Sequence, residues 1–246
     1  MEIEFDTNSQ PCILGISLSG YDDAEGSLVV YDADDPSKVF TKRDVSLDNN
    51  KRYFVRMPIS SEYVVIGAKG KNGEDIEIVD VEMYDFEENL SHEFFTRDEV
   101  NSFIDFAEEF ITNSSNLTAG ETKYYSDDDV YTIVYRDVIK DGGEYVPTPA
   151  RINQADGTME VSKKHFDKYS IPMRMAILLH EFAHFYLNDV MTDEIEADRN
   201  SLNIYMGLGY PRIDAYNVYL DVFEHSPSEL NVDRYEALNR LIRNHN

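Results

Sequence analysis

Cysteine is nearly absent from this chain. Its 246 residues include a single cysteine, Cys12, which excludes intramolecular disulfides and any metal site built from several cysteines. Cys12 stands in the strand-like run PCILGISL, so we expect a small core side chain.

Basic residues are also scarce. Lys and Arg number 22 against 48 Asp and Glu, and the formal net charge is −26. Nucleic-acid backbones are bound by clustered Lys and Arg, so we expect no nucleic-acid partner. A solvated acidic surface is the simplest interpretation of this charge.

The third absence is a long hydrophobic run. The run MAILL at residues 175–179 is the longest in its region, far short of the ~20 residues that span a bilayer. The first residues, MEIEFD, are acidic and lack the basic and apolar regions of a signal peptide. We therefore expect no membrane partner and a cytoplasmic or virion-associated protein.

The N-terminal third is rich in short apolar runs separated by turn signals. Seven such runs before residue 88 predict an immunoglobulin-like β-sandwich over residues 1–88. Asn72-Gly73 is a hairpin signal, and a change of phase between Ile78 and Val79 predicts a bulge. The predicted strands are Ile3–Phe5, Ile13–Ser19, Ser27–Tyr31, Val39–Leu47, Arg52–Ile59, Tyr63–Ala68 and Asp75–Tyr84.

A polar linker, Glu87–Glu93, leads to a second domain of α+β type over residues 94–246. Thr96, with Glu99 three residues later, forms a capping-box pattern for a helix that ends near Asn113. The polar residues 118–129 are expected to form a loop. Predicted strands are Tyr131–Lys140 and Thr158–Ser162, and predicted later helices are Asp193–Met206, Arg212–Phe223 and Pro227–Asn244.

Between these elements, Ile171–Leu187 reads IPMRMAILLHEFAHFYL and predicts a buried helix, because it is apolar on nearly every side. Ser170 suits the N-cap and Pro172 the first turn. Near its end stands HEFAH, an HExxH motif.

The spacing of this motif brings two imidazoles together. His180 and His184 lie about 40° apart around a helix and about 6 Å apart along its axis, so their rings can converge on one point. Glu181 lies about 60° to one side of His184, within reach of a water held at that point. Neutral imidazole is a good zinc ligand, and a carboxylate beside a zinc-bound water is a general base.

A third ligand is available shortly afterwards, in DEIEAD. Asp193 and Glu196 form a capping-box pattern at the start of another helix, on which Glu194 and Asp198 share a face. One of these two carboxylates can bind a metal while the other orients a ligand histidine. Other carboxylates compete for the ligand position: Asp189, Asp193 and Glu196.

HEFAH followed by the glutamate helix resembles the gluzincin metallopeptidases. That resemblance implies a zincin-like fold with zinc on His180, His184 and Glu194, with Glu181 as the catalytic base and Asp198 behind the first histidine. Nine residues separate His184 from Glu194, fewer than is usual in that family.

The leading hypothesis is therefore a zinc metallopeptidase that hydrolyses peptide bonds through a zinc-bound water. Its partner would be a peptide or protein substrate, which by analogy pairs with the strand Met159–Ser162 along the cleft. Such sites usually add a hydrogen-bond donor for the oxyanion. Downstream candidates are Tyr205, Tyr210, Arg212, Tyr216 and His225.

The alternative is a non-catalytic protein of an assembly. Zincin-like domains also occur in phage proteins, and an acidic, tyrosine-rich, cysteine-poor chain suits a phage virion component. The β-domain would then dock onto other proteins of the assembly, and zinc would be structural.

Overall fold

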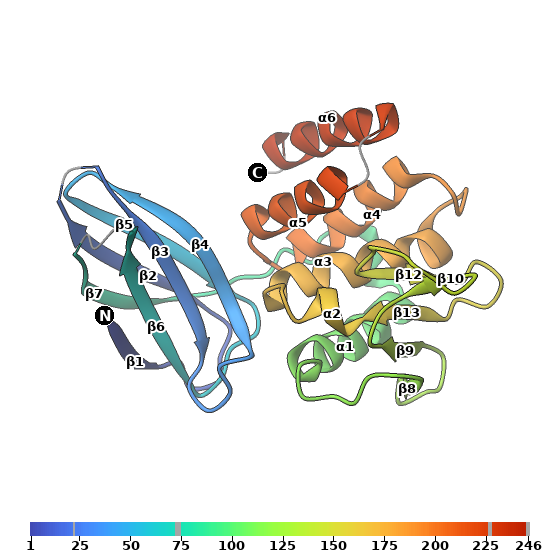
Figure 1. Ribbon diagram of the computed structural model, residues 1–246, viewed down its shortest axis with the longest axis horizontal. Coiled ribbons are helices and arrows are strands. Elements are labelled where there is room, and N and C mark those ends of the chain that lie inside the picture. The colour runs from blue at the N-terminus through green and yellow to red at the C-terminus, as the bar shows by residue number, and fades with distance from the viewer. Residues whose placement is uncertain (22, 72–74, 226–227, 245–246) are drawn as a thin grey trace. The chain divides into compact units, whose positions relative to one another are not determined.

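The computed structural model describes residues 1–21, 23–71, 75–225 and 228–244. It has mixed α+β architecture, with antiparallel sheets first and helices later (Figure 1). The chain divides into two compact units. One comprises Met1–Glu88 with Gly209–Pro211, and the other Asn89–Leu208 with Arg212–Asn246.

Two antiparallel sheets make up the first unit, with strand orders β1-β6-β3-β4 and β5-β2-β7. Alternate side chains point inward, as Leu14, Ile16 and Leu18 of β2 do, and they are fully buried. This alternation follows from the two-residue period of a strand. The strands are β1 (Glu2–Asp6), β2 (Cys12–Gly20), β3 (Ala24–Asp32), β4 (Val39–Leu47), β5 (Asn50–Met57), β6 (Tyr63–Gly70) and β7 (Ile76–Asp85).

The bulge expected in β7 is confirmed. Ser17 pairs with Asp80 but its neighbour Leu18 pairs with Ile78, so Val79 is the extra residue. The expected Asn72-Gly73 hairpin lies outside the described residues.

The strand order differs from that of an immunoglobulin domain. There the first, second, fifth and fourth strands share a sheet, whereas here the second and fifth pair with the seventh. The immunoglobulin-like part of the prediction is therefore wrong. Local patterns locate strands, but partner choice depends on packing between distant segments.

The second unit contains one larger sheet, of order β12-β13-β9-β8. Its β13 pairs in parallel with β9 and antiparallel with β12. The strands are β8 (Thr122–Tyr125), β9 (Thr132–Arg136), β12 (Ala150–Ile152) and β13 (Met159–Ser162), and β10 (Lys140–Asp141) pairs with β11 (Glu144–Tyr145).

Two details of this sheet correct the sequence analysis. Strand β13 is interior, so the edge strand is β12 and not Met159–Ser162. Strand β8 lies within residues 118–129, where a loop was expected. It is only four residues long, and its pairing with β9 rather than its own apolar pattern defines it.

The capping box predicted at Thr96 is wrong. The Thr96 hydroxyl donates to the carbonyl of Glu93 within a short 3₁₀ helix, η2 (Glu93–Thr96). Helix α1 (Asp98–Asn113) begins after it, with Arg97 at the N-cap and no side-chain capping bond.

Helix α3 (Ile171–Phe182) runs through the core of the second unit. Ser170 is its N-cap residue and Pro172 lies in its first turn, as expected. Ser170 makes no capping bond, however, and its hydroxyl donates to Asp214. Phe182 stacks on Phe103 of α1 with ring centroids 4.1 Å apart, which joins the two helices.

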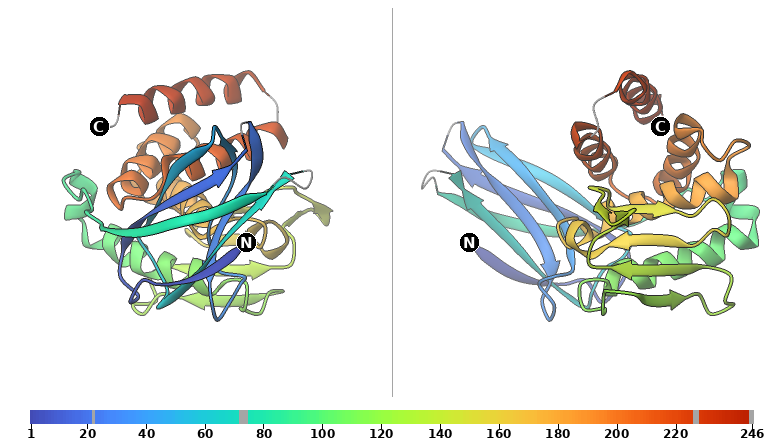
Figure 2. Two further views of the ribbon diagram at one scale, coloured as in Figure 1. Left: turned by 90° about the vertical axis from the view of Figure 1, so that its left-hand side faces the viewer. Right: turned by 45° about the vertical axis from the view of Figure 1, so that its right-hand side comes forward.

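The remaining helices gather on the side of α3 opposite α1, as two views show (Figures 1 and 2). They are α4 (Glu194–Gly207), α5 (Arg212–His225) and α6 (Glu229–Asn244), and a short α2 (Lys163–Phe166) precedes α3. Pro227, the predicted start of the last helix, lies outside the described residues.

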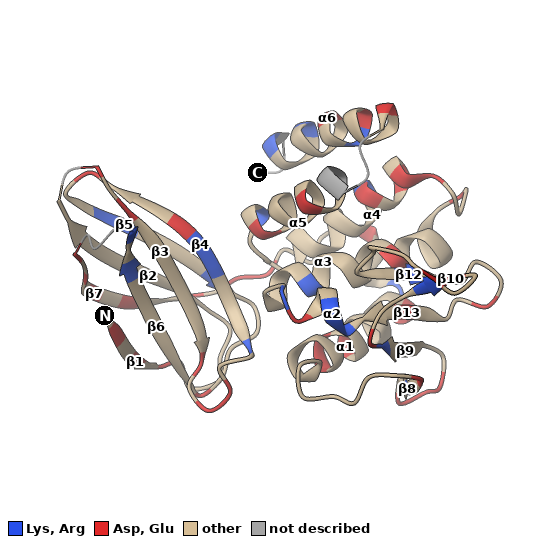
Figure 3. Cartoon of the chain, viewed as in Figure 1, with Lys and Arg blue, Asp and Glu red and all other residues tan. Residues whose placement is uncertain are grey.

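Acidic residues are spread over both units, with fewer basic residues among them (Figure 3). Among the described residues, no helix has the length and apolar character needed to cross a membrane.

Candidate metal centre

Both histidines of HEFAH come from one continuous helical stretch. His180 lies in the last turn of α3, and His184 in the π-helical segment η3 (Ala183–Leu187) that continues it. The single predicted helix Ile171–Leu187 therefore ends in a wider turn. π-Turns inside helices are frequent at functional sites.

A tight turn then carries the chain back to the histidines. The Asn188 side-chain amide donates to the carbonyl of Asp193, and the Asp193 carboxylate accepts the Glu196 N–H at 3.0 Å. Asp193 is thus the N-cap of α4, as the sequence indicates. Glu194 is the first residue of α4, so nine intervening residues are enough to return its carboxylate to the site.

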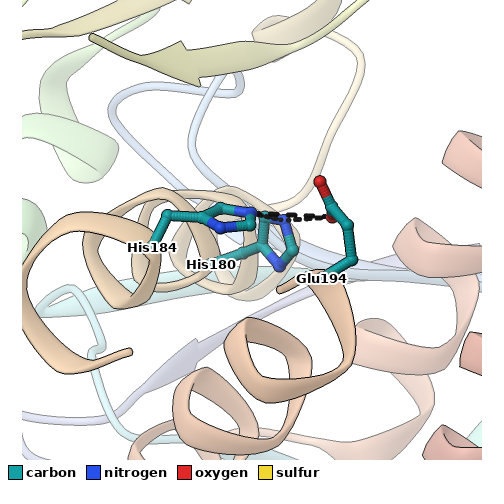
Figure 4. Close-up of side chains that lie close together, drawn as sticks. All are labelled: His180, His184 and Glu194. Carbon is teal, nitrogen blue, oxygen red and sulfur yellow. Dashed lines mark hydrogen bonds and ion pairs between the residues drawn. The ribbon is translucent and has the colours of Figure 1, made fainter. Parts of the chain in front are cut away.

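Three donor atoms converge at this point (Figure 4). The Nε2 atoms of His180 and His184 are 3.0 Å apart. Oε2 of Glu194 lies 3.4 Å from Nε2 of His180 and 3.5 Å from Nε2 of His184. Ligand atoms around a small tetrahedral metal ion, with bonds of about 2.0–2.1 Å, are about 3.3 Å apart. The donor set and its spacing therefore fit such an ion.

The contacts of the outer nitrogens leave the inner nitrogens of both rings available as metal ligands. Nδ1 of His184 lies 2.7 Å from the carbonyl oxygen of Met191, which can only accept, so Nδ1 carries the proton. Nδ1 of His180 lies 3.0 Å from Oδ1 of Asp198. In the neutral rings, both Nε2 lone pairs then point toward the Glu194 carboxylate.

Lone pairs and negative charge that meet at one point favour a bound cation. Burial alone would raise the pKa of Glu194 and Asp198, but the attraction of these carboxylates to the protonated form of the neighbouring histidines and to Arg234 outweighs it and lowers both pKa values. For His180, burial disfavours the charged ring, yet bonds to Asp198 and Glu194 outweigh it and raise the pKa. The surroundings of His180 thus stabilise a positive charge, which a proton or a metal ion can supply.

Glu181 lies beside this cluster and is partly buried. Burial raises its pKa above the ordinary value for glutamate, and the nearby histidines offset only part of that effect. Its carboxylate also accepts the backbone N–H of Ile152, at the edge strand β12.

His180, Glu181, His184 and Glu194 all border one cavity of about 460 Å³, and Asp198 lies outside its lining. Edge strand β12 lines it with Ala150, Arg151 and Ile152. Helices α3, α5 and α6 supply further lining residues, namely Ala176, Ile177, Val218, Tyr219, Val222, Leu230, Asn231 and Arg234.

The competing carboxylates lie elsewhere. Asp189 and Asp193 are exposed, and Asp193 is engaged as a helix cap. Glu196 accepts the Val190 N–H and pairs with Arg199. Of the four nearby carboxylates that follow HEFAH, Glu194 is the one grouped with both histidines.

Four of the five predicted oxyanion donors do not line the described cavity. Arg212 donates to the carbonyl of Ile242, and the Tyr216 hydroxyl bonds to that of Tyr235. Tyr205 and Tyr210 are buried and are also absent from the lining. His225 is the last residue of α5, and its side chain lies outside the described part of the chain.

Two residues that the sequence analysis missed, Tyr219 and Arg234, do line the cavity. Burial raises the pKa of Tyr219, so its hydroxyl keeps its proton. Arg234 is buried against the carboxylates of α4. No local pattern marks either residue, because each reaches the site only through the packing of α5 and α6.

No protein-family model, curated protein or solved structure matches this chain.

Proposed function

We propose that this protein is a zinc-dependent metallopeptidase of zincin type. The observation that carries the proposal is the convergence of His180, His184 and Glu194 beside Glu181 in an open cavity. A site that served only to stabilise the fold would have no need of a cavity or of a carboxylate next to the ligands.

Zinc suits this donor set, because two imidazole nitrogens and one carboxylate oxygen are its usual ligands in hydrolases. When bound, zinc would act as a Lewis acid that polarises a carbonyl and acidifies a water. His180, His184 and Glu194 would hold it at the cavity that all three border.

Glu181 would move the proton in this reaction. Burial raises the pKa of Glu181 toward neutral pH. A pKa nearer the working pH suits a group that must first accept a proton and later donate it. It would accept a proton from the attacking water and deliver it to the departing amine. Tyr219 and Arg234 also border the cavity, and the Tyr219 hydroxyl would be the hydrogen-bond donor for the developing oxyanion.

Edge strand β12 is suited to align an extended peptide. Residues 149 and 153 form backbone bonds toward β13, so the backbone groups of Ala150 and Ile152 face the other way. The Ile152 N–H lies close enough to bond to Glu181, which places this edge at the site. A substrate would add to β12 as a further strand.

The zincin-like interpretation of the fold rests on three features of the second unit. They are a mixed sheet with an antiparallel edge strand, a central helix with both histidines, and a following helix with the third ligand.

The test combines metal analysis with a peptide-cleavage assay. Wild-type protein should contain about one zinc per chain, and Glu194→Ala should lose most of it. Glu181→Gln should keep zinc and the fold yet lose cleavage by at least about 10³-fold. A wild type that binds zinc but cleaves no peptide would instead favour the assembly protein, and a wild type that binds no metal would contradict the metal site itself.

A further inference from the structure

Arg234 of α6 contacts both carboxylates that organise the metal centre. Its Nε and Nη2 atoms donate to Oδ2 and Oδ1 of Asp198 at 2.8 and 2.9 Å. Its Nη1 lies 3.0 Å from Oε2 of Glu194, the same oxygen that faces both histidines. The side chains of Arg234 and Asp198 are only 9% and 5% exposed.

This arrangement uses the planar shape of a guanidinium group. Two nitrogens grip one carboxylate and the third reaches a second, which a lysine ammonium cannot reproduce with the same geometry. Through Glu194, Arg234 orients a metal ligand directly. Through Asp198, it orients the ring of His180, because Asp198 contacts Nδ1 of that ring.

The sign of its effect on metal binding follows from the charges around it. A lone cation so close to the ligands would repel a metal ion. The bidentate bond to Asp198 largely neutralises that charge, so the repulsion is small. Arg234 also removes the repulsion between Glu194 and Asp198, which are four residues apart on α4. Orientation of the ligands is therefore the larger effect.

We propose that Arg234 is a positioning residue of the metal centre, so that the docking of α6 onto α4 completes the site. The inference rests on the proposed metal site but not on peptidase activity. Leu238, one turn further along α6, is buried and helps to hold the helix in place. Leu230 and Asn231 of the same helix line the cavity. Helix α6 therefore orients the ligands through Arg234 and also forms part of the cavity wall.

The experiment measures zinc affinity by competition with a chromophoric chelator, without any activity assay. The variants are Arg234→Ala and Arg234→Lys, and the matched control is Arg240→Ala, an exposed arginine on the same helix. Arg234→Ala should bind zinc roughly 10- to 100-fold more weakly than wild type, as expected when a group behind the ligands is lost. Arg240→Ala should bind as wild type does.

Two further measurements separate positioning from a loss of folding. The visible spectrum of the cobalt-substituted protein should change in Arg234→Ala and Arg234→Lys, because it reports ligand geometry, while circular dichroism verifies the fold. Arg234→Lys should restore only part of the zinc affinity, since lysine supplies the positive charge without the planar guanidinium that bonds to both carboxylates. If Arg234→Ala does not fold, Arg234→Lys carries the test.

Each outcome decides the question. Unchanged or tighter zinc binding in a folded Arg234→Ala, or full recovery with lysine, would overturn the positioning role and leave the proposed function intact. A wild type that binds no metal would overturn both.

Discussion

Arg174 is the largest fully buried side chain in the described part of the protein, with 1% of its surface exposed. Its guanidinium donates to the carbonyls of Phe166 and Ile111 and to the hydroxyls of Ser114 and Ser115. One side chain of α3 thus donates hydrogen bonds to acceptors at the C-terminal ends of both α1 and α2. It was visible in the sequence only as a basic residue in an apolar run.

Replacement of Arg174 by methionine should destabilise the fold strongly. Two buried carbonyls and two hydroxyls would lose their donor, and we expect a loss of at least about 3 kcal/mol in the free energy of unfolding. Denaturant titration measures it. Arg199→Met, at an exposed position on α4, is the control and should change stability by less than about 0.5 kcal/mol. Similar small losses in both variants would refute this role.

Cys12 should be almost unreactive in the native protein. It is 2% exposed, and burial raises the pKa of its thiol to about 11. Only the thiolate reacts, and at pH 8 it would be about 0.1% of the total with that pKa. A chromogenic disulfide reagent should therefore modify Cys12 slowly at pH 8, faster as the pH rises toward 11, and at once in denaturant. Rapid, complete modification of native protein at pH 8 would contradict the burial.

At the scale of elements, the nine-residue segment between His184 and Glu194 must reverse the chain within a short distance to bring the two side chains together. The π-turn η3, the Asn188 bond to the Asp193 carbonyl and the Asp193 cap form one compact reversal. The start of α4 sets where Glu194 points, so the helix cap is also a determinant of the metal centre.

Loss of the cap should affect stability and metal binding together. Asp193→Ala should lower the free energy of unfolding by about 1 kcal/mol, within the usual range of about 0.5–2 kcal/mol for an N-cap. It should also weaken zinc binding, because the first turn of α4 holds Glu194. Thermal unfolding with and without zinc measures both effects. Asp189→Ala, an exposed position in the same turn, should leave both unchanged, and equal effects of the two variants would refute the cap.

At the scale of the whole molecule, the dominant property is a net charge of −26. Like charges on a compact chain repel one another and lower its stability. Salt screens this repulsion, with a Debye length that falls from about 30 Å at 0.01 M to about 8 Å at 0.15 M.

The melting temperature should therefore rise with ionic strength. We expect an increase of a few degrees between 10 and 150 mM sodium chloride, measured calorimetrically on metal-free protein. Choline chloride at equal ionic strength is the control and should give the same increase, since the effect is screening and not sodium binding. A melting temperature that falls or stays constant would show that surface repulsion is unimportant here.

Much of the fold was accessible from short-range patterns. The run Val39–Leu47 was placed with the observed bounds, and the bulge at Val79 followed from a change of phase in apolar residues. The immunoglobulin order and the Thr96 cap were wrong for related reasons. Each depends on which of several segments pairs with a given backbone group. The local periodicity of apolar residues does not reveal that choice.

The candidate site divides in the same way. HEFAH and DEIEAD are local motifs, and helical spacing by itself brings His180 toward His184 and Glu194 onto the same face as Asp198. Convergence of the two motifs, the edge strand at Glu181 and the arrival of Arg234 and Tyr219 come from packing among β12, α4, α5 and α6. Local geometry therefore sets which atoms can be ligands. Long-range packing sets which atoms surround them, because side chains 40 residues apart meet only when the helices that carry them are buried against one another.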